Sequence, residues 1–257
     1  MKLAASDFDG TLFKTDSICG EDIAAVREWR KAGHKFGVIT GRDYGLLLPL
    51  LQHFGIESDF VVCNNGAILF DGTGRLLYQA PIDRDVVVAL ALQPCLAGSL
   101  HVAFSQGDKT YIFRNREGSW IFREAGQWNF PLQIISEADI AHLEGVQQLS
   151  LGFAAAEDAA ACTRQLNELF GDRIIACQNR GSVDITSRTI NKSQGIKKLL
   201  ELMHWTEDRL YVIGDELNDL PMIRRFEGYA IASAREEIRR EAKQTFPTVG
   251  SMLRQFI

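Results

Sequence analysis

The 257-residue sequence lacks any apolar run that approaches the ~20 residues needed for a membrane-spanning helix. Its N-terminus also lacks the basic stretch and long apolar segment that are typical of a secretory signal peptide. We therefore expect a cytoplasmic protein that does not act on or in a membrane.

Cysteine is sparse, and no C-x-x-C pair occurs. The sequence has five cysteines, which are scattered along the chain: Cys19, Cys63, Cys95, Cys162 and Cys177. An odd number of widely spaced cysteines is typical of reduced thiols in a cytosolic protein. The pattern argues against a disulfide framework and against a zinc site.

An excess of positive charge is also missing. The chain has 28 Lys and Arg against 33 Asp and Glu, for a net charge of −5, and its five histidines are isolated. Proteins that hold nucleic acid on a broad basic face have the opposite balance. The composition, 46% hydrophobic and 24% charged, is that of an ordinary globular protein with no nucleic-acid partner.

Short apolar runs alternate with helical patterns in the first part of the chain. Strands are predicted at 2–8, 34–40 and 59–63, helices at 21–33 and 42–55, and a hairpin at 67–78 with its turn at 71–74. Strands separated by helices favour parallel pairing in an α/β domain. The same alternation returns late, with helices at 191–203, 218–226 and 233–242 and strands at 209–215 and 227–232. Ser233 and Glu236 are placed to form a capping box for the last of these helices.

The middle of the chain has a different pattern. Helices at 83–96 and 156–171 accompany several alternating strand segments, two of them around a turn at Gly107. Helices beside an antiparallel sheet indicate a separate α+β unit. The predicted fold is therefore a Rossmann-like α/β parallel-sheet core, residues 1–79 and 188–257, with an inserted α+β domain at 80–187.

Polar residues follow the strands of the predicted core where each strand ends. They are Asp7 and Asp9, Thr40 to Arg42, Asn64 and Asn65, and Asp215 with Asn218 and Asp219. The carboxyl ends of parallel strands share one edge of the sheet, where ligands of such sheets bind. Segments about 200 residues apart are therefore expected to meet there.

The residue types at this edge indicate phosphoryl transfer. Clustered carboxylates with no Cys or His among them suit Mg²⁺, which prefers oxygen ligands. Lys192 opens a helix, an unfavourable place for a cation unless an anion lies nearby. One aspartate could attack phosphorus, and a second could transfer the proton.

Four motifs resemble those of the haloacid dehalogenase superfamily, in the same order. They are "DFDGTL" at 7–12, "ITGR" at 39–42, Lys192, and "GDELND" at 214–219. The "NNGA" at 64–67 and the size of the insertion are similar to Cof-type phosphatases of subfamily IIB, which carry a C2B cap domain. The resemblance spans the whole chain.

The resemblance implies a role for each matching residue. Asp7 would be the nucleophile, and Asp9 the general acid and base. Asp7, Asp215 and the backbone carbonyl of Asp9 would bind Mg²⁺, and Asp219 would support this site. Thr40, Gly41, Lys192 and Asn218 would contact the phosphoryl group. The inserted domain would close over the substrate as a cap.

Two further residues have a less specific signal. Asn65 is expected to help shape the site or to cap the turn into the hairpin. Arg42 could contact substrate or form a salt bridge with a neighbouring carboxylate.

The activity that best fits these residues is Mg²⁺-dependent hydrolysis of small phosphorylated metabolites, with sugar phosphates as the expected class. A phosphosugar mutase, or a phosphatase for one glycosyl phosphate such as mannosylglycerate phosphate or sucrose phosphate, would use the same site. A binding protein on the same scaffold would not need Asp9. We expect a monomer or a weak homodimer.

Overall fold

The computed structural model describes all residues, 1–257. The chain divides into two compact units: residues 1–40, 51–78 and 191–257 form the first, and residues 41–50 and 79–190 form the second. The insertion predicted from the sequence, 80–187, falls within the second unit. The short segment Gly41–Leu50, which the sequence analysis placed in the core, groups with the second unit as well.

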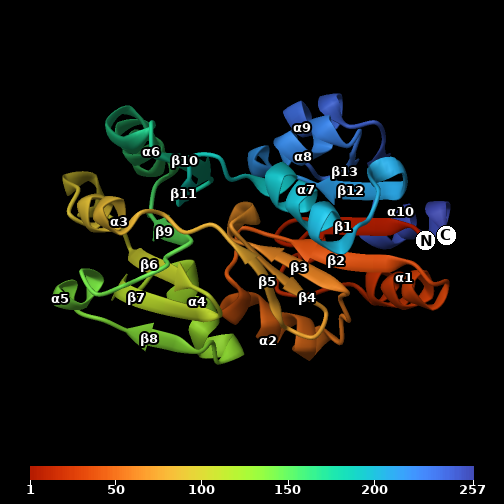
Figure 1. Ribbon diagram of the computed structural model, residues 1–257, viewed down its shortest axis with the longest axis horizontal. Helices are drawn as coiled ribbons and strands as arrows, with labels where there is room; N and C mark the ends of the chain where they lie inside the picture. The colour runs from red at the N-terminus through yellow and green to blue at the C-terminus, as the bar shows by residue number, and fades with distance from the viewer. The chain divides into compact units, whose positions relative to one another are not determined.

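The first unit is built around an eight-stranded sheet (Figure 1). In spatial order its strands are β14 (Thr245–Phe246), β13 (Tyr229–Ile231), β12 (Leu210–Gly214), β1 (Leu3–Asp7), β2 (Lys35–Ile39), β3 (Phe60–Cys63), β4 (Ile68–Asp71) and β5 (Leu76–Gln79). The pairs from β14 to β3 are parallel, whereas β3 and β4 are antiparallel. The predicted α/β parallel sheet and the hairpin at its edge are confirmed.

Helices cover both faces of this sheet (Figure 1). The helices of the first unit are α1 (Gly20–Lys31), α7 (Lys192–Met203), α8 (Leu220–Arg225), α9 (Glu236–Glu241) and α10 (Val249–Phe256), with the 3₁₀ turns η1 (Asn64–Gly66), η3 (Glu207–Arg209) and η4 (Leu217–Asp219). Helix α1 packs against α10, and α8 packs between α7 and α9. The central strands β1 and β2 therefore consist almost entirely of buried residues, as parallel strands between two helical layers require.

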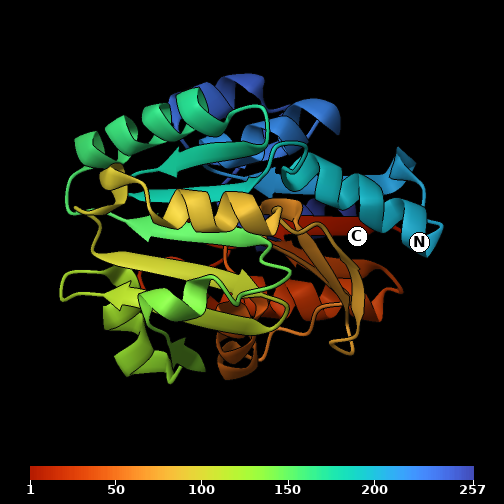
Figure 2. The ribbon, with the colours of Figure 1, turned by 60° about the vertical axis from the view of Figure 1, so that its left-hand side comes forward.

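The second unit contains a six-stranded sheet in the order β10 (Ile174–Asn179), β11 (Ser182–Ser187), β9 (Gln148–Gly152), β6 (His101–Gln106), β7 (Lys109–Asn115) and β8 (Leu132–Ile134). All neighbours are antiparallel except β7 and β8. Its helical elements are α3 (Arg84–Ala91), α4 (Trp120–Trp128), α5 (Glu137–Ile140), α6 (Ala156–Phe170) and the turn η2 (Pro94–Leu96). Figure 2 shows this sheet with helices α3 and α6 beside it.

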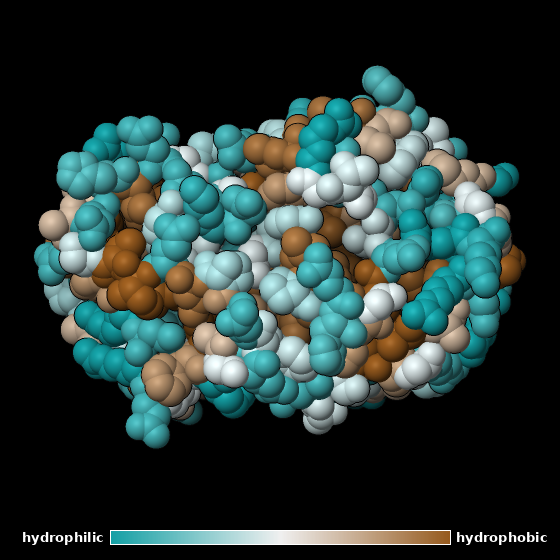
Figure 3. Space-filling view, turned by 90° about the horizontal axis from the view of Figure 1, so that it is seen from below, coloured by the Kyte–Doolittle hydropathy of each residue, from teal (hydrophilic) through white to brown (hydrophobic).

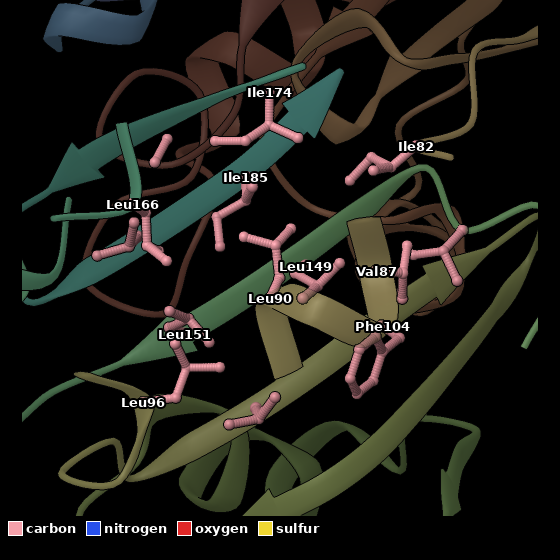
Figure 4. Packing of buried hydrophobic residues seen from close by; sticks show 14 of the residues in the cluster. Ile82, Val87, Leu90, Leu96, Phe104, Leu149, Leu151, Leu166, Ile174 and Ile185 are labelled. Atoms are coloured by element: carbon pink, nitrogen blue, oxygen red, sulfur yellow. The ribbon is translucent and has the colours of Figure 1, made fainter. Parts of the chain in front are cut away.

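The core of the second unit forms where these helices meet the sheet (Figure 4). Leu90 of α3 and Leu166 of α6 pack with Phe104, Leu149 and Ile185 of the strands, and all five are fully buried. A smaller cluster of Ala103, Ile112 and Ile121 involves α4 instead. The two clusters share strands β6 and β7, whose alternating side chains point to opposite faces of the sheet.

Helix α2 (Tyr44–Phe54) crosses the boundary between the units at Leu50. Its N-terminal segment is bound to the second unit by polar contacts. Gln148 donates a hydrogen bond of 2.7 Å to the carbonyl of Gly41, and Thr110 and Ser105 donate to the Asp43 carboxylate at 2.8 and 3.2 Å. These contacts explain why residues 41–50 group with the insertion.

One local prediction was wrong. Helix α9 begins after Arg235, not after Ser233, and Arg235 makes no side-chain cap hydrogen bond. Ser233 and Glu236 therefore do not form the predicted capping box.

None of the helices is both long enough and apolar enough to cross a lipid bilayer. Figure 3 shows that hydrophilic residues cover much of one face of the protein, with hydrophobic side chains gathered in smaller groups between them.

Candidate active site

The strand ends of the first unit bring the two aspartate motifs together. Strand β1 ends at Asp7, and β12 ends at Gly214, one residue before Asp215. These strands are parallel neighbours, with Ser6 paired to Ile213. Asp7 directly follows Ser6, and Asp215 comes two residues after Ile213, so the two carboxylates emerge at the same edge of the sheet.

Three buried carboxylates form a cluster at this edge. One oxygen from each of Asp7, Asp215 and Asp219 lies within 4.8 Å of the others. The three residues are 4%, 5% and 0% exposed, so water screens their charges little. Such a cluster needs cations to be stable, and its all-oxygen ligand set suits a hard divalent metal ion.

Lys192 supplies one positive charge. Its ammonium group donates hydrogen bonds of 2.6 Å to both Asp7 and Asp219, and its side chain is completely buried. The residue opens helix α7, whose N-cap Asn191 accepts a hydrogen bond from the backbone N–H of Gln194. The cap fixes the start of the helix and with it the origin of the Lys192 side chain.

The electrostatics of the cluster follow from burial and from mutual repulsion. Burial, together with the charge of Asp219, raises the pKa of Asp7 well above its ordinary value, although Lys192 opposes the shift. The same two causes raise the pKa of Asp215 to about 6. For Lys192, burial alone would lower the pKa, but the carboxylates of Asp219 and Asp7 outweigh it and raise the pKa above the ordinary value. The lysine therefore stays charged, but its single positive charge does not neutralise the three carboxylates.

The Asp219 carboxylate is held by its own motif. Its second oxygen accepts hydrogen bonds from the backbone N–H groups of Asp215 and Glu216, at 2.9 and 3.0 Å. Asp219 thus binds both the ammonium of Lys192 and the backbone that carries Asp215. These hydrogen bonds fix Lys192 and Asp215 in their positions within the cluster.

Thr11 and Gly10 shape the site around Asp215. The Thr11 hydroxyl donates a 2.8 Å hydrogen bond to the Asp215 carboxylate. Gly10 has a φ of +88°, and a Cβ atom there would lie 2.3 Å from an Asp215 oxygen. Only glycine combines this backbone conformation with so close an approach. Thr11 lies within the "DFDGTL" motif, but its bond to Asp215 was not predicted from the sequence.

Residues at the ends of β2 and β3 lie along the same sheet edge. The Thr40 carbonyl accepts a hydrogen bond from the backbone N–H of Asn65 at 2.9 Å, and the Asn65 side-chain carbonyl accepts one from Asn218 at 3.0 Å. Both Asn64 and Asn65 have left-handed backbone conformations, with φ of 51° and 54°. This tight turn links the ends of β2 and β3 to the "GDELND" segment.

Two buried polar groups at this edge have no hydrogen-bond partner. They are one carboxylate oxygen of Asp7 and the side-chain amide of Asn64. An unsatisfied buried polar atom is costly, so each is a place where a ligand would add a favourable contact. The unpaired Asp7 oxygen in an oxygen-rich cluster fits a bound metal ion. Asn64 was expected at this strand end, but no sequence pattern shows that its amide is buried without a partner.

Three predicted residues remain, Asp9, Gly41 and Arg42. Asp9 follows Asp7 by two residues, is partly exposed and does not belong to the group of clustered carboxylates. Gly41 and Arg42 belong to the second unit. The Arg42 guanidinium bonds to the Glu124 carboxylate at 2.7 and 3.5 Å and lies 5.2 Å from the centre of the Trp120 ring. Of the two possibilities for Arg42, the structure therefore shows the salt bridge.

Comparisons with known proteins agree with this geometry. The sequence pattern of the haloacid dehalogenase-like hydrolases matches residues 4–250. Among curated proteins, the phosphatase YwpJ of Bacillus subtilis is 25% identical, with 93% of this chain and 92% of that protein covered. The HMP-PP phosphatase of Yersinia pestis is also 25% identical, with 95% and 88% covered.

Solved structures share the fold over the full chain. A haloacid dehalogenase-like hydrolase from B. subtilis superposes with a TM-score of 0.84 at 21% identity, covering 100% of both chains. A sugar phosphatase of haloacid dehalogenase subclass IIB gives 0.81 at 20% identity, covering 100% of this chain and 99% of that one. The resemblance inferred from the four motifs is confirmed. Because the family pattern covers nearly the whole sequence, this protein belongs to the haloacid dehalogenase-like hydrolases and is one of their phosphatases.

Proposed function

We propose that this phosphatase hydrolyses phosphate monoesters of small metabolites, with sugar phosphates as the class, in a Mg²⁺-dependent reaction through an aspartyl-phosphate on Asp7. The observation that supports this most is the buried cluster in which Lys192 bonds to both Asp7 and Asp219 beside Asp215. Three carboxylates are buried around a single lysine, so a metal ion would be favourable in this site. The positive charges of the metal ion and Lys192 would together attract a phosphate group.

Mg²⁺ would be held by carboxylate oxygens of Asp7 and Asp215 and by the backbone carbonyl of Asp9. When bound, it would neutralise the repelling carboxylates and attract the phosphoryl oxygens of the substrate. The unpartnered Asp7 oxygen supports this assignment. Asp219 would keep Lys192 and the Asp215 backbone in place through its three hydrogen bonds.

In the first step of the proposed reaction, a carboxylate oxygen of Asp7 attacks phosphorus and the bond to the leaving oxygen breaks. Asp9 gives its proton to that oxygen, so the product leaves as an alcohol. Lys192, the Thr40 hydroxyl and the Gly41 backbone would hold the phosphoryl oxygens, and Asn218, positioned by Asn65, would orient the group. Lys192 also opposes the effect of burial on the Asp7 pKa and so favours the ionised, nucleophilic carboxylate.

In the second step, Asp9 has lost its proton and accepts one from water. The water oxygen attacks phosphorus, the bond to Asp7 breaks, and inorganic phosphate leaves. Both carboxylates return to their starting states, so each cycle consumes one ester and one water.

The second unit is proposed to act as the cap that selects the substrate. Its own sheet, helices and core make it an independent body that could vary without disturbing the sheet that carries Asp7. The partner would be a small phosphorylated metabolite in the cytoplasm, and we propose a monomer or a weak homodimer. Two of the similar proteins are described as an HMP-PP phosphatase and a sugar phosphatase, so both substrate classes belong in a substrate panel.

A substrate panel with matched variants tests the proposal. Phosphate release from an aryl phosphate, sugar phosphates and HMP-PP is measured with Mg²⁺ and with a chelator, and product analysis separates hydrolysis from isomerisation. Asp7→Asn should lower kcat by more than about a thousandfold. Asp16→Asn is the control, because Asp16 is exposed in a turn with a φ of 58°, which asparagine tolerates equally well.

Either of two results would contradict the proposal. One is full activity of Asp7→Asn, which would remove the nucleophile. The other is activity that survives complete chelation of divalent metal, which would remove the Mg²⁺ requirement.

A further inference from the structure

Two of the five cysteines are in contact, although 67 positions separate them in the sequence. The Sγ atoms of Cys95 and Cys162 lie 3.2 Å apart. Both residues belong to the second unit: Cys95 is in η2 and Cys162 is in α6. The other three thiols lie elsewhere, on β10 for Cys177 and in the first unit for Cys19 and Cys63.

Packing fixes both thiols in this arrangement. Cys162 is 1% exposed and belongs to the hydrophobic core of the second unit, between Ala159 and Leu166 on α6. Cys95 packs against the same core but is only partly buried. A disulfide has an S–S bond of about 2.05 Å, so the two sulfur atoms would need to approach by only about 1 Å.

We propose that Cys95 and Cys162 form a reversible disulfide when the protein meets a low-molecular-weight disulfide of the glutathione type. The pair would thus be an oxidation site inside the second unit, separate from the phosphatase site in the first.

The difference in exposure sets the order of events. Cys95 is the more exposed of the two thiols, and its thiolate attacks one sulfur of the oxidant, forming a mixed disulfide and releasing one small thiol. Cys162 then loses its proton and attacks the Cys95 sulfur, which releases the second small thiol. Two protein thiols are oxidised, one small disulfide is reduced to two thiols, and the electrons balance.

Burial makes the second step the slower one. Burial, with the bond to Cys95, raises the pKa of the Cys162 thiol, so little of it is ionised at neutral pH. The short distance compensates, because the thiol lies next to the sulfur that it attacks. The disulfide would tie η2 to α6 and close the chain from 95 to 162 into a loop, which stabilises the folded unit.

The test uses the full-length protein and oxidised glutathione. After incubation, remaining thiols are alkylated, and a non-reducing digest is analysed by mass spectrometry. We expect a Cys95–Cys162 cross-link, three alkylated cysteines, recovery of all five thiols with dithiothreitol, and an oxidised Tm higher by roughly 5–10 °C.

Single variants separate this site from general oxidation. Cys95→Ser and Cys162→Ser should each abolish the cross-link, whereas the matched control Cys177→Ser should keep it. If Cys162→Ser fails to fold, Cys95→Ser alone is decisive, because Cys95 is only partly buried. A lasting glutathione adduct on Cys95 in the unmodified sequence, a cross-link to another cysteine, or five alkylated thiols would overturn the proposal.

Discussion

Lys192 illustrates how single residues determine what the site can hold. A fully buried lysine is stable only if its charge is compensated, and here two carboxylates accept hydrogen bonds from its ammonium group at 2.6 Å. The carboxylate of Asp215 lies close to both of them, so the cluster has more negative charge than one lysine neutralises. The individual residues thus leave a deficit of positive charge that a metal ion would remove.

Gly10 offers a sharp test of the space around Asp215. In Gly10→Ala, the new Cβ would lie 2.3 Å from an Asp215 oxygen and would displace that carboxylate. We expect phosphatase activity to fall by at least about a hundredfold and stability to fall by roughly 1–2 kcal/mol. Activity assays and chemical unfolding measure the two effects.

Gly33→Ala is the matched control for that variant. Gly33 has a φ of +82°, close to the +88° of Gly10, but a Cβ there would meet nothing within 4 Å. It should lose similar stability and keep its activity. Equal activity of both alanine variants would show that the close approach of residue 10 to Asp215 does not affect catalysis.

His101 should make the stability of the second unit depend on pH. It is fully buried, its Nδ1 lies 2.8 Å from the Ser119 hydroxyl, and burial lowers its pKa from 6.5 to about 4. Above pH 6.5 both folded and unfolded states are neutral, so the group has no effect. As pH falls from 6.5 toward 4, only the unfolded state gains a proton, and up to about 3 kcal/mol of stability is lost.

His101→Gln isolates this contribution, since glutamine can still bond to Ser119 but does not titrate. The free energy of unfolding is measured at pH 7 and pH 4 for both proteins. The unmodified protein should lose roughly 3 kcal/mol more than the variant over this range. Parallel pH profiles would contradict the account of His101.

Among the elements, α4 and the Gly41–Leu50 segment show what sequence patterns miss. The strands β1, β2, β3 and β12 were predicted because buried parallel strands are continuous apolar runs. Helix α4 was not predicted; it ends at Trp128, and the left-handed residue that follows is Asn129 and not a glycine. The grouping of residues 41–50 with the second unit depends on Gln148, Thr110 and Glu124, which no local pattern connects to them.

The Arg42–Glu124 pair should therefore be important for stability. Both side chains are about 6% exposed, so Glu124→Ala would remove a buried carboxylate that bonds to the Arg42 charge. We expect a loss of roughly 3–5 kcal/mol in chemical unfolding. The exposed Glu117→Ala should change stability by less than about 0.5 kcal/mol.

The double variant Arg42→Met with Glu124→Leu separates charge from packing. Replacing both partners with apolar residues should recover most of the loss, because no buried charge is left uncompensated. If Glu124→Ala costs no more than Glu117→Ala, the pair does not hold this segment.

At the scale of the whole molecule, the sequence predicted which strand ends meet at one edge of the sheet better than it predicted the side-chain contacts there. The rule that parallel strands share a carboxyl edge was enough to bring Asp7 and Asp215 together across about 200 residues. The unpartnered Asn64 amide and the Thr11 bond to Asp215 could not be predicted, because both depend on side-chain positions in the folded state. The same holds for the contact of Cys95 with Cys162.

The central claim is that Asp7 forms the phosphoryl intermediate, and trapping that intermediate tests it most directly. Asp9→Asn removes the base of the second step, whereas the first step can still proceed with an aryl phosphate, whose leaving group departs without a proton. The variant is therefore mixed with an aryl phosphate and Mg²⁺, quenched in acid, and digested for mass spectrometry. The account predicts one phosphoryl group, on Asp7, that appears only with Mg²⁺ and is absent from Asp7→Asn. A phosphoryl group on another residue, or turnover by the unmodified enzyme with none ever trapped on Asp7 in either protein, would contradict it.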